Sequence, residues 1–483
     1  MSESLRNKSV KSFGWKFAQQ LCTLGATFVI QLILARILEP ADFGIVAITT
    51  VFMTLANTII DTSFSSAVIQ RASIDQNQMS SLFFANFGLS LLVYAVLFFT
   101  APLITGFYGE PLLTPILRVQ GLRVLFSAMY SIQSALLTRR MEFQKIFVAY
   151  LCGAIVQGVV GIGMAKLGFG IWALVISTVV NYLVAGLMIV VMSAWLPKPY
   201  FSYHLVKDAL SFSSKVLVVS VVKKLFYNVR KIAMGKVYDS TVLGLFDKGF
   251  QFPSTIMTVV DGSLTQVAFT SLSKLQDNKK KLSDAMRLYV QMITYITAPM
   301  LLGMIMVAKP MVIVLLTEKW IECVPYLRIV CLTNLFVPLL VKSDAFNAIG
   351  RSDMSMKLNV SGIILAIVLL LGCIPLSPHV MVFSGFVSNL LLHIAIGVAT
   401  KKEFGYTYRE QVKDFFRPIL LSLPMCAAIF LISLLPMPVL LKLVTEIVLG
   451  IFVYLAVSYV TKNHSFHMCM EFAKPIVKKY IKK

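Results

Sequence analysis

The sequence predicts an all-α polytopic membrane protein with about 14 transmembrane helices. Hydrophobic residues make up 58% of its 483 residues and charged residues only 14%, whereas about 25% of residues are charged in an ordinary soluble domain. Apolar runs of roughly 20 residues, long enough to cross a hydrocarbon core of about 30 Å, recur from one end of the chain to the other. The longest polar stretches, 265–287 and 461–483, are too short for a soluble catalytic domain.

The first six predicted spans form one group. A basic N-terminal segment precedes the first of them without a small-residue cleavage site, so we expect a retained helix and not a signal peptide. The seven cysteines are scattered and odd in number, which argues against a disulfide framework. These six spans are 17–38, 44–63, 80–101, 115–137, 146–165 and 171–193.

A second group of six spans follows, and two more spans end the chain. The fourth, seventh and tenth spans are the most polar of the set. We therefore predict an N-terminal six-helix lobe over 1–194, a C-terminal six-helix lobe over 195–402, and two extra helices with a basic cytoplasmic tail over 403–483. The later spans are 212–234, 242–264, 288–307, 325–346, 358–376, 380–400, 415–435 and 439–460.

Charge predicts the topology. If both termini are cytoplasmic, the inner segments hold about 28 of the 44 Lys and Arg residues and the outer loops about five, as the positive-inside rule requires. The same rule accounts for the net charge of +22 without a nucleic-acid partner. About eleven basic residues remain inside spans, where their presence needs another explanation.

The chain contains an internal duplication. Residues 35–39 and 43–45 resemble 235–239 and 243–245, and the same offset of 200 pairs Asp61 with Asp261. Further on, Arg118 pairs with Arg328 at an offset of 210. Six spans separate the copies, so both enter the membrane in the same orientation. This predicts two lobes related by an axis along the membrane normal, as in many alternating-access transporters.

The seventh span carries five basic residues: Lys215, Lys223, Lys224, Arg230 and Lys231. At 100° per residue, the first, second and fourth of these fall within about 80° of one another. A cation at the bilayer centre costs roughly 2.5–3.5 kcal/mol, so it should face a wet cavity or a partner. Residues near the helix ends can instead snorkel to the interface, an alternative that is weaker for the two central lysines. The functional interpretation is a cationic cavity for an anionic substrate.

Other charged residues inside spans are weaker candidates. The basic ones line the same cavity or anchor helix ends, and the acidic ones bind a coupling proton or sodium ion, pair with the basic residues, or cap a helix. The basic candidates are Arg118, Arg123, Arg328 and Lys342, and the acidic candidates are Asp61, Asp261 and Asp247.

Motifs of catalysis and metal binding are absent from the sequence. It has no Walker motif, no nucleophile elbow and no paired carboxylates set in a soluble cleft. His464 and His467 form an HxxH pattern on a short polar tail, which we interpret as coincidence. We expect no enzymatic activity, no cofactor and no metal site.

Several segments resemble the bacterial polysaccharide transporters, the Wzx-like flippases of the multidrug/oligosaccharidyl-lipid/polysaccharide (MOP) superfamily. Residues 35–44 are similar to the family's ARxLxPxDFG signature, and further matches run in order from about residue 14 to 357. Ser63 departs from the Gly that is common in relatives, which affects only local packing. The other matching segments are 168–175, 227–230, 235–236, 316–320, 324–329 and 347–353.

The resemblance implies two six-helix bundles around a central cavity, with two added C-terminal helices. It also implies an undecaprenyl-pyrophosphate-linked oligosaccharide as substrate, moved from the cytoplasmic to the periplasmic leaflet of the inner membrane, with polymerases and glycosyltransferases as partners. On this hypothesis Lys223, Lys224 and Arg230 hold the pyrophosphate. The full set of candidate substrate-binding residues is Lys223, Lys224, Arg230, Lys215, Asn228, Arg118, Arg123, Arg328 and Lys342.

Two alternatives compete with a flippase. A drug or ion antiporter of the same superfamily typically takes cationic compounds, which this many basic residues would repel. A membrane-embedded polymerase or glycosyltransferase would need a sizeable loop for its chemistry, and the sequence has none. Membrane potential, protons and sodium ions all remain open as the driving force.

Overall fold

The computed structural model describes residues 3–64, 68, 74–260, 271–276, 278–463, 465, 466 and 468. Every regular element in this part is helical, and the chain divides into two compact units, Met1–Asp247 and Lys248–Lys483. The division falls inside a helix, whereas the predicted boundaries lie at 194/195 and 402/403, and those boundaries stay a prediction.

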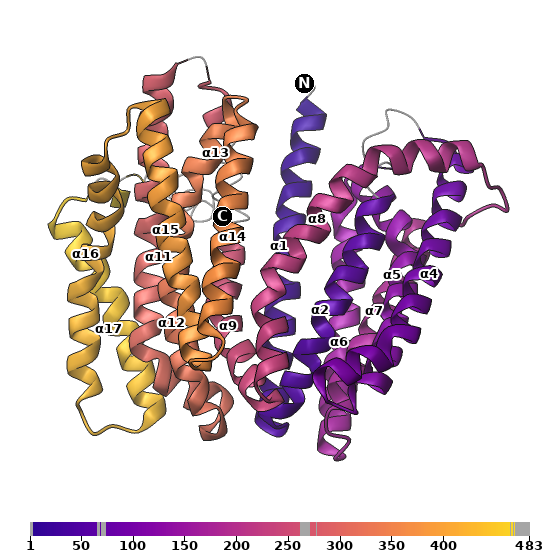
Figure 1. Cartoon of the computed structure of the whole chain (residues 1–483), viewed down its shortest axis with the longest axis horizontal. Coiled ribbons are helices and arrows are strands. Elements are labelled where there is room, and N and C mark those ends of the chain that lie inside the picture. Colours follow the sequence, from indigo (N-terminus) through magenta and orange to yellow (C-terminus); the bar gives the residue numbers. More distant parts are fainter. Residues whose placement is uncertain are drawn as a thin grey trace. The chain divides into compact units, whose positions relative to one another are not determined.

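The described part of the first unit contains seven long helices and the start of an eighth, α9 (Ser240–Val260) (Figure 1). The last of the seven, α8, packs against α2 and α4, while α1 packs on α6 and α5 packs between α4 and α7. The seven helices are α1 (Glu3–Ile37), α2 (Pro40–Ser63), α4 (Gln76–Tyr108), α5 (Leu113–Arg139), α6 (Phe143–Lys166), α7 (Trp172–Ser193) and α8 (Tyr203–Val237).

The second unit takes up most of α9 (Ser240–Val260) and all later helices (Figure 1). The chain over Glu318–Ala348 is broken into two short α-helices and two 3₁₀ turns, η2 and η3, and a proline lies at the first or second position of two of these four pieces, α12 and η3. The later elements are α11 (Lys279–Leu316), η2 (Glu318–Cys323), α12 (Val324–Asn334), η3 (Val337–Leu340), α13 (Val341–Ala348), α14 (Ser352–Cys373), α15 (Pro378–Phe404), α16 (Tyr408–Ser433) and α17 (Val439–Val460).

Eleven helical segments of the described chain are long and apolar enough to cross a membrane. The protein is therefore an all-helical, multi-pass membrane protein. Helices α5, α8 and α9 lie over the fourth, seventh and eighth predicted spans but are not among the eleven. They are long enough to cross, and charged side chains lower their hydropathy, so the count of fourteen stays a prediction.

Local sequence signals fix several helix ends. Asp75 accepts a hydrogen bond from the backbone N–H of Gln78, whose side chain accepts one from the N–H of Asp75, so a capping box begins α4. The same helix ends at Gly109, which has φ of 78° and thus occupies the left-handed region that glycine enters without strain. A second capping box, between Thr407 and Glu410, begins α16.

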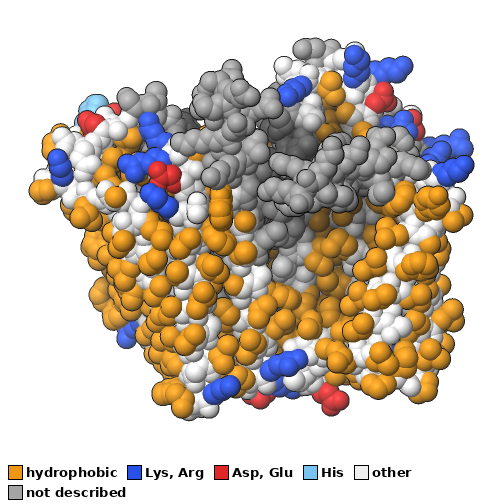
Figure 2. Space-filling model, turned by 180° about the vertical axis from the view of Figure 1, so that it is seen from behind, with side chains coloured by type: hydrophobic (Ala, Val, Ile, Leu, Met, Phe, Trp, Pro, Cys, Tyr) orange, Lys and Arg blue, Asp and Glu red, His pale blue; other side chains and the backbone are white. Residues whose placement is uncertain are grey.

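The outer surface of the helices suits lipid. Figure 2 shows hydrophobic side chains over the middle of the visible face, with most Lys and Arg side chains at its upper and lower edges. On α4, for example, Phe99 is 76% exposed and Leu103 is 74% exposed. Large apolar side chains at this exposure are unfavourable in water and favourable in a hydrocarbon core, which agrees with a membrane-spanning surface.

Two glycines related by the internal duplication allow a close helix crossing. A Cβ atom added to Gly44 of α2 would overlap the backbone carbonyl of Ser240, the first residue of α9. A Cβ atom added to Gly244 of α9 would overlap the carbonyl of Pro40, the first residue of α2. Since 40 and 240 share the offset of 44 and 244, the contact is reciprocal, as contacts about a two-fold axis are.

An ionic network attaches α16 to α11 within the second unit. Arg287 of α11 binds Asp414 at 2.9 Å and Glu410 at 2.7 Å, and Gln291 donates to Asp414 at 2.7 Å. The Tyr406 hydroxyl donates to the same carboxylate at 2.8 Å. Burial, and then the Asp414 carboxylate, raise the pKa of the Tyr406 phenol well above its ordinary value. The phenol thus stays protonated and remains a donor.

Candidate functional site

The first unit contains an open cavity of about 610 Å³ lined by α1, α2, α5, α6 and α7. Nearly all of the residues that line it carry a polar side chain. The described polar lining residues are Thr23, Thr27, Gln31, Thr50, Asp61, Gln120, Arg123, Ser127, Tyr130, Ser131, Ser134, Thr138, Tyr150, Gln157, Thr178, Asn181 and Tyr182.

Helix α5 supplies the largest share of this wall. Gln120, Arg123, Ser127, Ser131 and Ser134 follow one another at intervals of three or four residues, so they share one helix face. Of these five, only Arg123 is among the candidates from the sequence. The other four are uncharged and therefore less conspicuous in a span than a cation, although their spacing of three or four residues is a signal of a polar helix face.

Arg123 is fixed at the cavity wall by contacts from two other residues. Its guanidinium donates to the Tyr182 hydroxyl at 3.2 Å and to the Gln120 amide oxygen at 3.5 Å. The guanidinium carbon also lies 4.5 Å from the centre of the Tyr182 ring, a cation–π arrangement. The structure thus places Arg123 on a cavity, but one to which α8 contributes no described residue, so the expectation of a cavity shared with the α8 cations stays a prediction.

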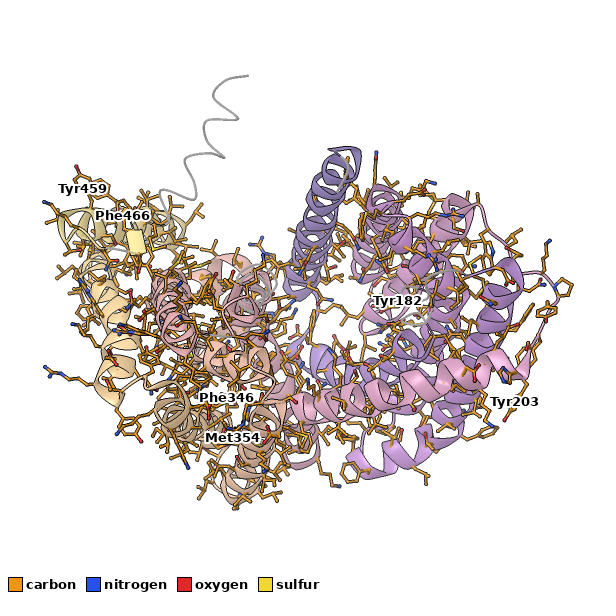
Figure 3. All side chains as sticks on the ribbon, turned by 90° about the horizontal axis from the view of Figure 1, so that it is seen from above. Tyr182, Tyr203, Phe346, Met354, Tyr459 and Phe466 are labelled. Carbon is orange, nitrogen blue, oxygen red and sulfur yellow. The ribbon has the colours of Figure 1, made fainter. Side chains whose placement is uncertain are left out.

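Tyr182 lies inside the ring of first-unit helices in the view of Figure 3. Its hydroxyl also accepts a hydrogen bond of 3.4 Å from the Asn57 amide. Next to it on α7, Asn181 donates to Gln157 of α6 at 2.9 Å. These residues tie α2, α5, α6 and α7 together around the polar space.

The three acidic candidates have different positions. Asp61 lines the cavity, where the Ser127 hydroxyl donates to it at 3.4 Å. Asp247 forms an ion pair with Lys231, so it follows the pairing alternative. Asp261 lies outside the described residues.

The cations of α8 are separate from this cavity. Lys223 and Lys224 are exposed, Arg230 is half-buried, and within the described chain no carboxylate forms an ion pair with any of the three. Asn228 is buried and its amide donates to the carbonyl of Lys224 at 2.8 Å, within the same helix. The side chain of Lys215 lies outside the described residues.

The repeat-related pair Arg118 and Arg328 make equivalent contacts in the two units. Arg118 Nε donates to the carbonyl of Phe98 on α4 at 3.4 Å, and Arg328 Nε donates to the carbonyl of Ile305 on α11 at 3.2 Å. The Arg118 guanidinium also lies 4.2 Å from the Phe98 ring centre. In each case the side chain braces a neighbouring helix, which favours the anchoring alternative over cavity lining.

Lys342 lies in the second unit, 3% exposed, beside a small, mainly apolar cavity of about 190 Å³. Its ammonium donates to the Gln411 amide oxygen at 2.9 Å. Gln411 is held in turn by the carbonyls of Gly397 and Tyr406, at 3.0 and 2.7 Å. Lys342 is thus positioned by α16, one of the two extra helices.

Metal binding finds no support in the described chain, where no three His, Cys, Asp or Glu side chains cluster as metal ligands would. His464 and His467 of the HxxH pattern lie outside the described residues.

Comparison with known proteins assigns the family. Residues 33–325, more than half of the chain, match the family described as "Polysaccharide biosynthesis protein". The chain belongs to this family. Among similar proteins, the lipopolysaccharide biosynthesis protein WzxC of Escherichia coli is 24% identical over 436 residues, which cover 87% of each chain. The succinoglycan biosynthesis transport protein ExoT of Rhizobium meliloti is 26% identical over 69% of this chain and 68% of its own.

Solved structures identify the fold. The lipid II flippase MurJ, in an inward closed conformation, superposes with a TM-score of 0.71 at 17% identity over 97% of this chain and all of its own. An inward-facing MATE multidrug transporter of the MOP superfamily superposes with a TM-score of 0.63 at 14% identity, over 80% of this chain and 94% of its own. This family member therefore has the MOP transporter fold. It is a multi-pass membrane protein of a polysaccharide biosynthesis family.

Proposed function

We propose that this protein is a flippase for an undecaprenyl-pyrophosphate-linked oligosaccharide, which it moves from the cytoplasmic to the periplasmic leaflet of the inner membrane. The observation that carries the proposal is the set of cations on α8. Lys223, Lys224 and Arg230 have no ion pair within the described chain, although they lie on a helix packed among membrane-spanning helices. A pyrophosphate is the anion whose charge would balance them.

The mechanism we infer is alternating access between two six-helix lobes, 1–194 and 195–402, with the helices of 403–483 added to the second lobe. The lipid tail would stay in the bilayer while the head group crosses. Moving one negative charge outward across an inside-negative potential releases about 2.3 kcal/mol per 100 mV, and a pyrophosphate carries more than one such charge. ATP is therefore not needed for net export.

The relatives support a sugar-lipid substrate more than a drug. MurJ is a lipid II flippase, and ExoT is a transport protein of succinoglycan synthesis. The likeness to a MATE transporter concerns the fold alone. The cations Lys223, Lys224 and Arg230, which form no ion pair with another described residue, would repel the cationic compounds that drug exporters typically take.

The decisive experiment reconstitutes the purified protein in liposomes that contain lipid-linked oligosaccharide extracted from its host. In protein-free liposomes, membrane-impermeant periodate should oxidise only the glycans of the outer leaflet, about half of the total, because lipid-linked sugars do not cross a bilayer unaided. With the protein present, we expect nearly all glycans to become accessible. Accessibility that stays at half, with folded protein in the vesicles, would refute the flippase function.

Topology gives a second prediction, for which Lys280→Cys and Glu318→Cys form a matched pair of exposed positions in a cysteine-free background. With both termini cytoplasmic, an impermeant maleimide added to intact cells should label the Glu318→Cys variant and leave Lys280→Cys unlabelled. After permeabilisation both should react. Labelling of the Lys280→Cys variant in intact cells would show that the predicted orientation is wrong, and with it the proposed direction of transport.

A further inference from the structure

The polar cavity of the first unit has no role in the pyrophosphate binding proposed for α8. It lies among α1, α2, α5, α6 and α7, and α8 contributes no residue to its described wall. Of the described lining residues, only Arg123 and Asp61 are charged, with opposite signs. The cavity therefore differs from α8 in character: it is close to neutral and rich in hydroxyl and amide groups, which does not suit a pyrophosphate.

The hydrogen-bonding capacity of the wall is only partly used. The Asn181 amide donates to the Gln157 oxygen, which leaves the Asn181 oxygen as an acceptor and the Gln157 NH₂ group as a donor, side by side. The Tyr182 hydroxyl accepts from Arg123 and Asn57 and can still donate its own proton. The Nε of Arg123 is buried and has no partner within the described chain. Such adjoining donors and acceptors match ligand groups that both donate and accept.

Sugar hydroxyls have this property, since each is a donor and an acceptor at once. Tyrosine rings add flat apolar faces beside polar tips, which suit the mixed surface of a sugar ring. The volume of about 610 Å³ falls within the roughly 300–1,000 Å³ of pockets that enclose small organic ligands. A short oligosaccharide is of this size.

We propose that this cavity binds the uncharged sugars of the transported glycolipid, while the α8 cations bind its pyrophosphate. This assignment rests on the flippase function proposed above and deepens it. Two separate regions of the first unit would bind two chemically different parts of one substrate. The cavity would then determine which oligosaccharide is accepted.

The test is the double variant Gln157→Leu/Asn181→Leu. The two side chains bond to each other, so replacing both by apolar groups of similar shape should change stability little. The purified variant is titrated with two lipids, the host's lipid-linked oligosaccharide and undecaprenyl pyrophosphate without sugar, and the dissociation constants are read from thermal shifts. We expect at least tenfold weaker binding of the glycolipid and unchanged binding of the sugar-free lipid.

A matched control is Ser343→Ala/Ser355→Ala, which removes a buried, mutually bonded pair in the second unit. It should bind both lipids as the wild type does. If the leucine variant binds the glycolipid as tightly as the wild type, or loses affinity for both lipids equally, the cavity is not a sugar site. The flippase function would still stand. If the wild type binds neither lipid, the proposed function itself fails. If the leucine variant does not fold, the Tyr182→Phe variant is tested in its place. It keeps the aromatic ring and must lower the affinity for the glycolipid alone.

Discussion

The double variant Lys223→Gln/Lys224→Gln is expected to reach the membrane in normal amount and to lose most of its transport. Glutamine keeps the length and polarity of both side chains but removes their charge. Each lysine lies on a helix packed among membrane helices and has no ion pair within the described chain, so its loss should not destabilise the protein. The attraction for a pyrophosphate would fall, and we expect at least a tenfold drop in the rate of glycan exposure in liposomes.

The matched control is Lys280→Gln/Lys281→Gln, which neutralises an adjacent exposed lysine pair at the start of α11. It should transport at the wild-type rate, because the predicted cytoplasmic end takes no part in binding. In cells, the Lys223/Lys224 variant should lose surface polysaccharide and accumulate lipid-linked precursor. Full transport by a well-expressed Lys223/Lys224 variant would overturn the cationic site, while the family membership would be unaffected.

Replacing Gly44 or Gly244 by alanine is expected to destabilise the protein severely. Each added methyl group would overlap a backbone carbonyl, of Ser240 or Pro40, and backbone cannot move aside as a flexible side chain can. Overpacking of this kind typically costs about 1–3 kcal/mol and sometimes more, and the cost here should lie at the upper end. We expect a clear loss of yield and a lower melting temperature in detergent for each variant.

The control for this prediction is Gly88→Ala in α4, where a Cβ atom would meet nothing within 4 Å. Alanine in an open helical position should be neutral or stabilise by up to about 1 kcal/mol. Because the Gly44 and Gly244 contacts are reciprocal, the two single variants should lose similar stability. Wild-type melting temperatures for both would show that the helices do not cross this closely.

Much of the fold could be predicted from the sequence because spanning a membrane imposes local rules. A run of about 20 apolar residues identifies a helix without knowledge of its neighbours. The extended polar stripes of α5 and α8 lowered the hydropathy of these helices, and the structure shows why α5 tolerates its stripe: the polar side chains face an internal cavity. The resemblance in residues 35–44 pointed to the family that the longer match over 33–325 then showed.

The candidate site was predicted less completely. The α8 cations stand out in the sequence because an intramembrane charge is conspicuous in one short segment, and their role stays a prediction. For Arg118 and Asp247, in contrast, the sequence left several alternatives open that local patterns do not separate. In the structure Arg118 contacts Phe98 of a neighbouring helix and Asp247 pairs with Lys231, and each partner lies at least 16 positions away along the chain.

The sequence by itself therefore determined the membrane class, the helical segments, the duplication and the excess of positive charge, since each is a property of short segments or of composition. Only the tertiary structure decided where the polar side chains meet. Tyr182, Asn181, Gln157 and Asp61 come from three helices, and no single one of these segments is unusual. Their shared cavity exists because helix packing turns the polar faces inward, where hydrogen bonds between helices replace those that lipid cannot offer.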